Sequence, residues 1–159
     1  LNSCYLRPKS RGTIRLRSAD PAVAPDIDPN YWAEPSDMAA SLRGLASARE
    51  IMAQPAFRPF VAREHLPGKD VTGRAELEAY ARRLGKTDYH PVGSCKMGTD
   101  DMAVVDTDCR VHGIERLRIC DSSIMPRVVS SNTNAASIMI GEKASDLVKG
   151  NRRSADEAA

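Results

Sequence analysis

Long apolar runs are missing from this sequence, whose uninterrupted apolar stretches are only a few residues long. A helix that crosses a bilayer needs about 20 such residues, and no charged segment followed by an apolar one opens the chain. We therefore expect neither a membrane span nor a signal peptide. Charge of one sign is also missing, since 23 basic and 21 acidic residues are mixed along the chain. No nucleic acid or anionic membrane is expected as a partner.

The four cysteines follow no ligand or redox pattern. They are Cys4, Cys95, Cys109 and Cys120, and no two of them form a C-x-x-C pair. None has a neighbouring histidine at the spacing of a zinc site. The sequence thus predicts no metal site, and it favours free thiols in a reducing, cytoplasmic location.

With 159 residues and 42% hydrophobic side chains, the chain is long enough to bury a real core as one compact unit. Residues 4–18 contain a strand-like stretch at 13–17 in which apolar and charged residues alternate, so one face is expected to be buried and the other exposed to solvent. Four prolines interrupt residues 19–35, which predicts a long loop or linker.

Helical spacing appears in three segments. Ser36 can cap a first helix that Pro55 ends, and a second helix is expected from Thr72 to Leu84, with Gly85 beyond its end. Short strands are expected at 103–105, 110–112 and 117–120, followed by a helix over 134–148 and a polar, frayed tail over 151–159. The predicted fold class is α+β.

Polar side chains that can support chemistry gather in three segments: 89–98, 117–126 and 131–134. His90 precedes Pro91 and Gly93, so its backbone cannot continue a helix and its ring projects from a constrained loop. Imidazole titrates near neutral pH, which suits a general base. A structural histidine in a tight turn is the alternative. We expect His65 and His112 to be surface or turn residues.

Asn132, Thr133 and Asn134 stand just before the last predicted helix, where capping alone would explain them. The same helix start also offers free N–H groups and partial positive charge to an anion. Asp121 follows an expected strand and can accept hydrogen bonds from a ligand or form a turn. Lys96 is expected to be solvated, as is Arg110.

Taken together, these segments resemble a known family. Residues 89–98, read Tyr-His-Pro-Val-Gly-Ser-Cys-Lys-Met-Gly, are similar to the histidine-proline motif of the glucose-methanol-choline (GMC) oxidoreductases. Residues 117–126, 131–134 and 138–147 resemble that family's terminal motif in order and separation. Upstream strings at 7–12, 18–21 and 27–31 are similar to its substrate-domain strands, so the likeness covers residues 5–149.

The resemblance implies FAD as cofactor and oxidation of a primary alcohol, choline or another, to the aldehyde. It implies that His90 accepts the hydroxyl proton while hydride passes to flavin N5, and that Asn134 hydrogen-bonds the substrate oxygen. Flavin contacts are implied for Asp121, Ser122, Asn132 and Thr133. The residues distinguish neither the alcohol nor the electron acceptor, and they do not specify an oligomeric state.

The family's amino-terminal G-x-G-x-x-G fingerprint is missing, and the chain begins with Leu1. We therefore expect a C-terminal fragment, inactive alone, that needs a missing N-terminal FAD domain as partner. In it, residues 1–88 would form a substrate-binding region with the substrate-domain sheet and helices. Residues 89–149 would be a catalytic and FAD-contacting region with the last strand and helix of the FAD domain. Residues 150–159 would be a flexible tail.

Two other functions are compatible with parts of this pattern. A binding module that lost its cofactor chemistry would have no need of His90 and Asn134. A hydrolase would use His90 with Ser94 or Cys95, but the G-x-S-x-G elbow is missing and these residues are too close on one loop to face each other.

Overall fold

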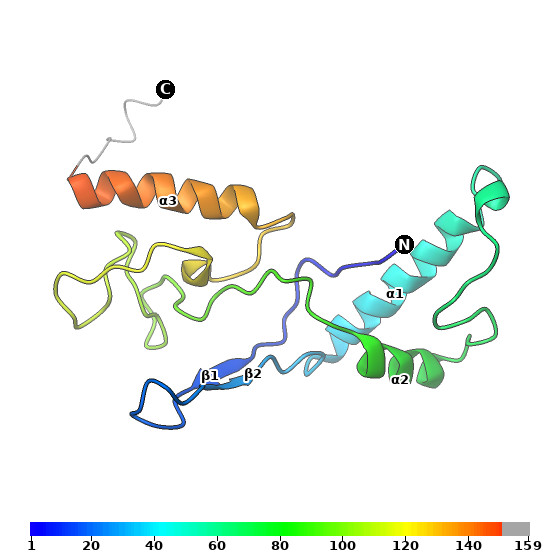
Figure 1. Ribbon diagram of the computed structural model, residues 1–159, viewed down its shortest axis with the longest axis horizontal. Coiled ribbons are helices and arrows are strands. Elements are labelled where there is room, and N and C mark those ends of the chain that lie inside the picture. Colours follow the sequence, from blue (N-terminus) through cyan, green and yellow to red (C-terminus); the bar gives the residue numbers. More distant parts are fainter. Residues whose placement is uncertain (151–159) are drawn as a thin grey trace. The chain divides into compact units, whose positions relative to one another are not determined.

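The computed structural model describes residues 1–150, which fall into two compact units. Unit 1 is Leu1–Asp88 and unit 2 begins at Tyr89. The predicted tail over 151–159 lies outside the described residues. Figure 1 shows the elements of both units, and each unit is described by itself below. No helix within residues 1–150 is both long and apolar enough to cross a membrane.

A two-stranded antiparallel sheet is the first regular structure in unit 1. Strand β1 (Thr13–Arg15) pairs with β2 (Asp26–Asp28), with Ile14 opposite Ile27. Every residue of both strands is exposed, so the expectation of one buried face is wrong. In Figure 1 the pair forms a narrow ribbon with a loop at its end, and two strands alone make too small a sheet to bury a face. Strand β2 is short because Pro25 and Pro29 flank it and cannot donate to a ladder.

Helix α1 (Pro35–Met52) carries the buried part of unit 1. Proline suits a first helical position because its missing N–H would have no intrahelical partner there. The predicted cap at Ser36 is wrong by two residues, since Glu34 is the N-cap and makes no side-chain cap bond. Asp37 is only 3% exposed, and its carboxylate accepts hydrogen bonds from the Lys9 and Ser10 amides and from the Ser10 hydroxyl at 2.6–3.0 Å. These bonds tie the amino-terminal segment to the helix.

Helix α2 (Arg74–Leu84) packs against α1. It begins two residues after the predicted start, with Gly73 as N-cap, and Gly85 follows its end as predicted. From α1, Arg49 reaches the connecting segment, where its guanidinium meets the Glu64 carboxylate at 2.9 Å. The same guanidinium donates to two carbonyls, those of Gly68 and Val71. One arginine therefore holds the irregular chain between the two helices.

Unit 2 has a small apolar core beneath helix α3 (Asn134–Lys149), which was predicted over 134–148. The buried core residues are Val105, Cys109, Ile124, Met125 and Ile140. The three predicted strands do not form. Instead, isolated bridges join Met97 with Val105, Val105 with Val111, and Arg110 with Arg118. Left-handed backbone at Cys109, Gly113 and Arg116 turns the chain every few residues, which leaves no segment straight for long enough to build a ladder.

Candidate functional site

Two of the three chemistry-bearing segments lie side by side in unit 2. The Cys95 amide donates to the Ser123 carbonyl at 3.0 Å, and the Met97 amide donates to the Ile124 carbonyl at 2.8 Å. Ser123 and Ile124 belong to a short 3-10 helix, η2 (Ser122–Ile124). The loop that carries His90 is therefore fixed along the segment that carries Asp121.

The backbone around His90 is constrained, as the sequence predicted. Tyr89 has φ 62° and Gly93 has φ 84°, both in the left-handed region. A Cβ on Gly93 would also lie 3.2 Å from the Met125 carbonyl oxygen, so glycine serves both the turn and the close approach. His90 itself is half-buried. The loop thus presents an imidazole whose backbone cannot relax into a helix.

A single carboxamide connects His90 to the start of α3. The amide nitrogen of Asn132 lies 3.2 Å from His90 Nε2, and Asn132 Oδ1 accepts the Asn134 backbone N–H at 2.8 Å. A backbone N–H can only donate, so it fixes Oδ1 on its side and turns the NH₂ group toward His90. His90 Nε2 must then accept, and the neutral ring carries its proton on Nδ1. The unprotonated nitrogen therefore faces Asn132.

Asn134, the predicted partner of His90, is the first residue of α3 and is exposed. Its backbone joins the network through Asn132, and within residues 1–150 no hydrogen bond links the two predicted catalytic side chains directly. The carboxamide beside the imidazole belongs to Asn132, which the resemblance placed among the flavin contacts. The N-T-N pattern marks both asparagines, but only the turn geometry selects the one that faces His90. The catalytic roles of these residues stay predictions.

Asp121 is the N-cap of η2, and its Oδ1 accepts the Ser123 amide at 2.7 Å. Hydrogen bonds from the Ser123 hydroxyl and amide lower the pKa of this carboxyl, against a smaller opposing effect of burial. The turn that the sequence offered as one alternative is therefore present, and the carboxylate is exposed. Ser122 is half-buried, whereas Thr133 is buried and its carbonyl accepts both the amide and the hydroxyl of Ser137.

Three other polar residues that the sequence singled out in unit 2 have local partners. Lys96, predicted to be solvated, is partly buried and pairs with Asp100 at 2.6 Å. Arg110 is exposed and lies 3.5 Å from the Asp108 carboxylate. His112 is exposed, with Nε2 3.2 Å from the Gly98 carbonyl oxygen. In the part of the chain that the structure describes, no group of three or more histidine, cysteine, aspartate or glutamate side chains could hold a metal ion.

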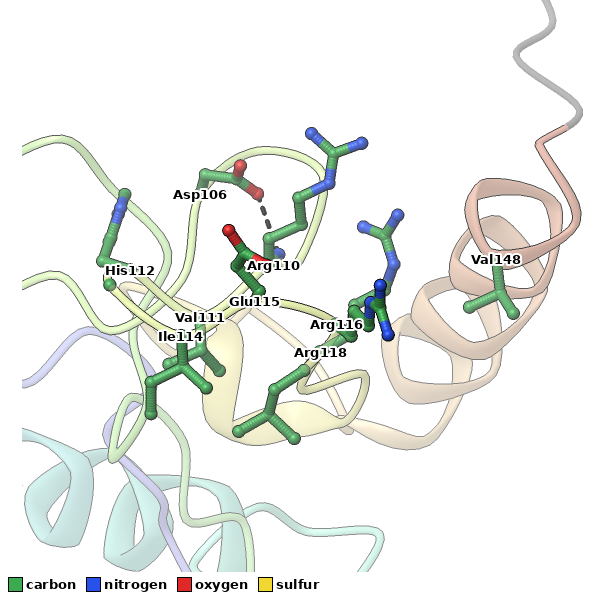
Figure 2. A pocket seen from close by; sticks show the side chains of 11 residues that line it. Asp106, Arg110, Val111, His112, Ile114, Glu115, Arg116, Arg118 and Val148 are labelled. Atoms are coloured by element: carbon green, nitrogen blue, oxygen red, sulfur yellow. Dashed lines mark hydrogen bonds between the residues drawn. The ribbon is translucent and has the colours of Figure 1, made fainter.

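A surface hollow of unit 2 lies away from His90. It has a volume of about 740 Å³ and is lined by residues of the 106–118 segment together with Val148 of α3. Figure 2 shows Arg110, Arg116 and Arg118 at this hollow, with the dashed bond from the Arg110 amide to Asp106. Neither His90 nor Asn132 lines it. The Arg118 guanidinium already donates a hydrogen bond to the Asp108 carbonyl, so one of its N–H groups is occupied within the turn.

The conserved-family model described as GMC oxidoreductase matches residues 8–141. That match covers most of the chain, including the His90 loop and the start of α3. The chain belongs to the GMC oxidoreductase family.

Curated relatives give a closer comparison. The chain is 48% identical over 145 residues to the oxygen-dependent choline dehydrogenase of Proteus mirabilis, a match that covers 91% of this chain and 26% of that protein. It is 46% identical over 147 residues to the oxygen-dependent choline dehydrogenase of Pseudomonas putida, covering 92% of this chain and 26% of the relative. The chain thus spans about a quarter of the length of these curated relatives.

Solved structures share the fold. The pyridoxine 4-oxidase of Mesorbium loti superposes with a TM-score of 0.86 at 30% identity, over 93% of this chain and 29% of that chain. A formate oxidase of Aspergillus oryzae superposes with a TM-score of 0.86 at 28% identity, over 92% of this chain and 26% of that chain. The architecture of both units is therefore that of the C-terminal region of GMC oxidoreductases, an FAD-dependent class of oxidoreductases.

Proposed function

We propose that this chain is the C-terminal, substrate-facing part of an FAD-dependent enzyme that oxidises the CH–OH group of a primary alcohol to the aldehyde. The observation that carries the proposal is the hydrogen-bonded series from His90 through Asn132 to the Asn134 amide, in a chain of this family. Choline is the first substrate to test, because the curated relatives are choline dehydrogenases.

His90 is the proton acceptor in this proposal. In this structure the Nε2 lone pair accepts from the Asn132 carboxamide, so a substrate hydroxyl that displaces this carboxamide from Nε2 could give its proton to the imidazole. The Asn132 N–H that now points at Nε2 would hydrogen-bond the substrate oxygen. One base and one donor would then converge on one oxygen, which lowers the cost of removing the proton as hydride leaves carbon.

The start of α3 fits a flavin. An α-helix of 16 residues leaves its first backbone N–H groups without intrahelical partners and carries about half a positive charge at this end. Asn132 and Asn134 are exposed there. FAD, when bound, would supply the hydride acceptor, and the helix end would favour the negative charge that its ring gains. Asp121, Ser122 and Thr133 are proposed as further flavin-contacting positions.

The hydrolase alternative loses its geometric basis. Within the described residues the hydrogen bond of the His90 ring goes to Asn132, and neither Ser94 nor Cys95 is bonded to the ring. The Cys95 backbone is instead fixed to the Ser123 carbonyl. A nucleophile must reach its base, and these residues do not.

The test uses the full polypeptide that carries these residues, reconstituted with FAD and assayed by anaerobic flavin bleaching with choline and other primary alcohols. We expect His90→Ala to slow flavin reduction by about 10²-fold or more, the range for loss of a general base. Asn132→Ala should slow it by about tenfold or more, because a hydrogen bond to a charged group contributes about 1.5–3 kcal/mol.

Lys96→Ala is the matched control, since its partly exposed ion pair with Asp100 contributes little. Unchanged flavin reduction in His90→Ala would end the proposal. A larger effect of Asn134→Ala than of Asn132→Ala would return the substrate-facing role to Asn134, as the sequence predicted.

A further inference from the structure

Two of the free thiols lie together in unit 2. Cys109 is 4% exposed within the core, and Cys120 packs against the same core cluster and is partly exposed. All four cysteines are free. The other two do not belong to this cluster, since Cys4 is in unit 1 and Cys95 is on the His90 loop.

The backbone brings this pair together and holds it in place. The Ile119 amide donates to the Cys109 carbonyl at 3.0 Å, and the adjacent residues Arg110 and Arg118 form an antiparallel bridge. Cys120 therefore directly follows Ile119, the residue whose amide is hydrogen-bonded to Cys109. The left-handed φ of 63° at Cys109 departs from regular strand geometry, which would otherwise place the two side chains on opposite faces. Burial raises the pKa of the Cys109 thiol, and a side-chain hydrogen bond with Cys120 raises it further.

From this geometry we propose that Cys109 and Cys120 form a reversible intrachain disulfide when the protein meets a hydroperoxide. Cys120 directly precedes Asp121, one of the proposed flavin-contacting positions. Oxidation would therefore fix the end of the turn from which that carboxylate projects. The thiol pairing does not depend on the proposed alcohol oxidation.

The chemistry balances with hydrogen peroxide as the oxidant. Cys120, the more exposed of the two, attacks one peroxide oxygen, the O–O bond breaks, and a sulfenic acid forms while hydroxide leaves with the thiol proton as water. The Cys109 sulfur then attacks the sulfenyl sulfur. The S–O bond breaks, the S–S bond forms, and the second hydroxide leaves with the Cys109 proton as water. Two thiols are oxidised and one peroxide is reduced to two waters.

The test treats the folded 159-residue chain with hydrogen peroxide, blocks the remaining thiols with an alkylating agent and digests it with trypsin. Cleavage after the lysine and arginine residues separates the two cysteines, with Cys109 in peptide 97–110 and Cys120 in peptide 119–127. We expect these two peptides to be joined in the oxidised sample, with a mass lower by two hydrogens than their sum, and to separate after dithiothreitol.

Matched variants make the result specific. Cys4→Ser should keep the joined peptides, whereas Cys109→Ser and Cys120→Ser should each lose them. In Cys109→Ser, dimedone should trap the sulfenic acid on Cys120. The proposal is overturned if peroxide that fully oxidises Cys4 leaves both core thiols alkylated. It is also overturned if Cys109 joins Cys4 or Cys95 as often as Cys120, because the fold would then not select the pair. The same oxidation of the chain unfolded in urea gives the reference distribution of disulfides that forms when the fold selects no pair.

Discussion

The Asp37 carboxylate is the buried polar side chain of unit 1, and it accepts several hydrogen bonds. Burial alone would raise its pKa, but hydrogen bonds from the Ser10 hydroxyl and from the Lys9 and Ser10 amides outweigh this effect and lower it. The ionised form is therefore the one that the fold stabilises. This carboxylate joins α1 to a segment 27–28 residues away in sequence, so its loss should release the amino-terminal strand-bearing region.

We predict that Asp37→Asn lowers the free energy of unfolding by about 2 kcal/mol, since a hydrogen bond to a charged group contributes about 1.5–3 kcal/mol. Urea titration measures the change, and Asp70→Asn, at an exposed aspartate, is the control. A depressed folded pKa gives stability that is fully present above the ordinary aspartate pKa near 3.9 and is lost as pH falls through the lower folded value. The difference between wild type and Asp37→Asn should therefore shrink below about pH 4. A difference that grows on acidification would contradict this account.

At the scale of elements, Gly85 and Gly141 have different surroundings, so substituting each of them tests a different effect: packing at Gly85 and helix propensity at Gly141. A Cβ on Gly85, just beyond α2, would overlap the Trp32 ring and lie 2.6 Å from the Ala81 carbonyl oxygen. A Cβ on Gly141, inside α3, would meet nothing within 4 Å. The first glycine is required by its neighbours, whereas the second only weakens its helix.

Gly85→Ala should lower the free energy of unfolding by about 1–3 kcal/mol, the usual cost of inserting a methyl group where no space exists. Gly141→Ala should raise it by up to about 1 kcal/mol, because alanine is the better helix former. Thermal unfolding of both variants beside wild type checks the pair. If the two substitutions shift Tm in the same direction, the surroundings described for one of the glycines are wrong.

The sequence predicted those elements whose signals are local. Proline and glycine punctuation together with three- and four-residue spacing located all three α-helices to within about two residues, an ordinary boundary error. Strand pairing needs a partner, and the sequence missed β2 because its three residues lie between prolines. The burial of Asp37 depends on residues 9 and 10, and a one-dimensional pattern does not show such a contact.

The candidate site shows the same division. The position of the His90 loop and the start of α3 followed from motif and capping residues, and the structure places the loop beside the Asp121 segment. Which asparagine faces the imidazole did not follow, because residues 132 and 134 are both plausible until the turn between them is known. The resemblance supplied the roles, and these await the kinetic test.

At the scale of the whole molecule, large apolar side chains are more often exposed than buried in the described residues. Leu16, Phe60 and Val148 are 86%, 84% and 67% exposed. Single exposed apolar residues are normal on a protein surface, but large side chains that are mostly exposed rather than buried leave a small core for a chain of this length. Together with a length about a quarter of that of its curated relatives, this supports the proposal that further protein is needed to enclose a flavin.

We predict that the 159-residue chain, mixed with FAD, leaves the absorption and fluorescence of the free cofactor unchanged and separates from it on gel filtration. An amino-terminal domain that carries the G-x-G-x-x-G fingerprint should restore retention when co-expressed, because that loop and helix bind the pyrophosphate. The same domain with its fingerprint glycines changed to alanine is the control. Stoichiometric FAD on the chain alone would show that the missing fingerprint is not needed.

The Asn132 carboxamide is shared between two neighbours, since its oxygen serves the first amide of α3 and its nitrogen serves His90. A mutation at this position removes the hydrogen bond at His90 Nε2 and the bond to the first amide of α3 together. An evolutionary path or an engineering scheme that changes what faces the imidazole must therefore supply a replacement cap for the helix in the same step.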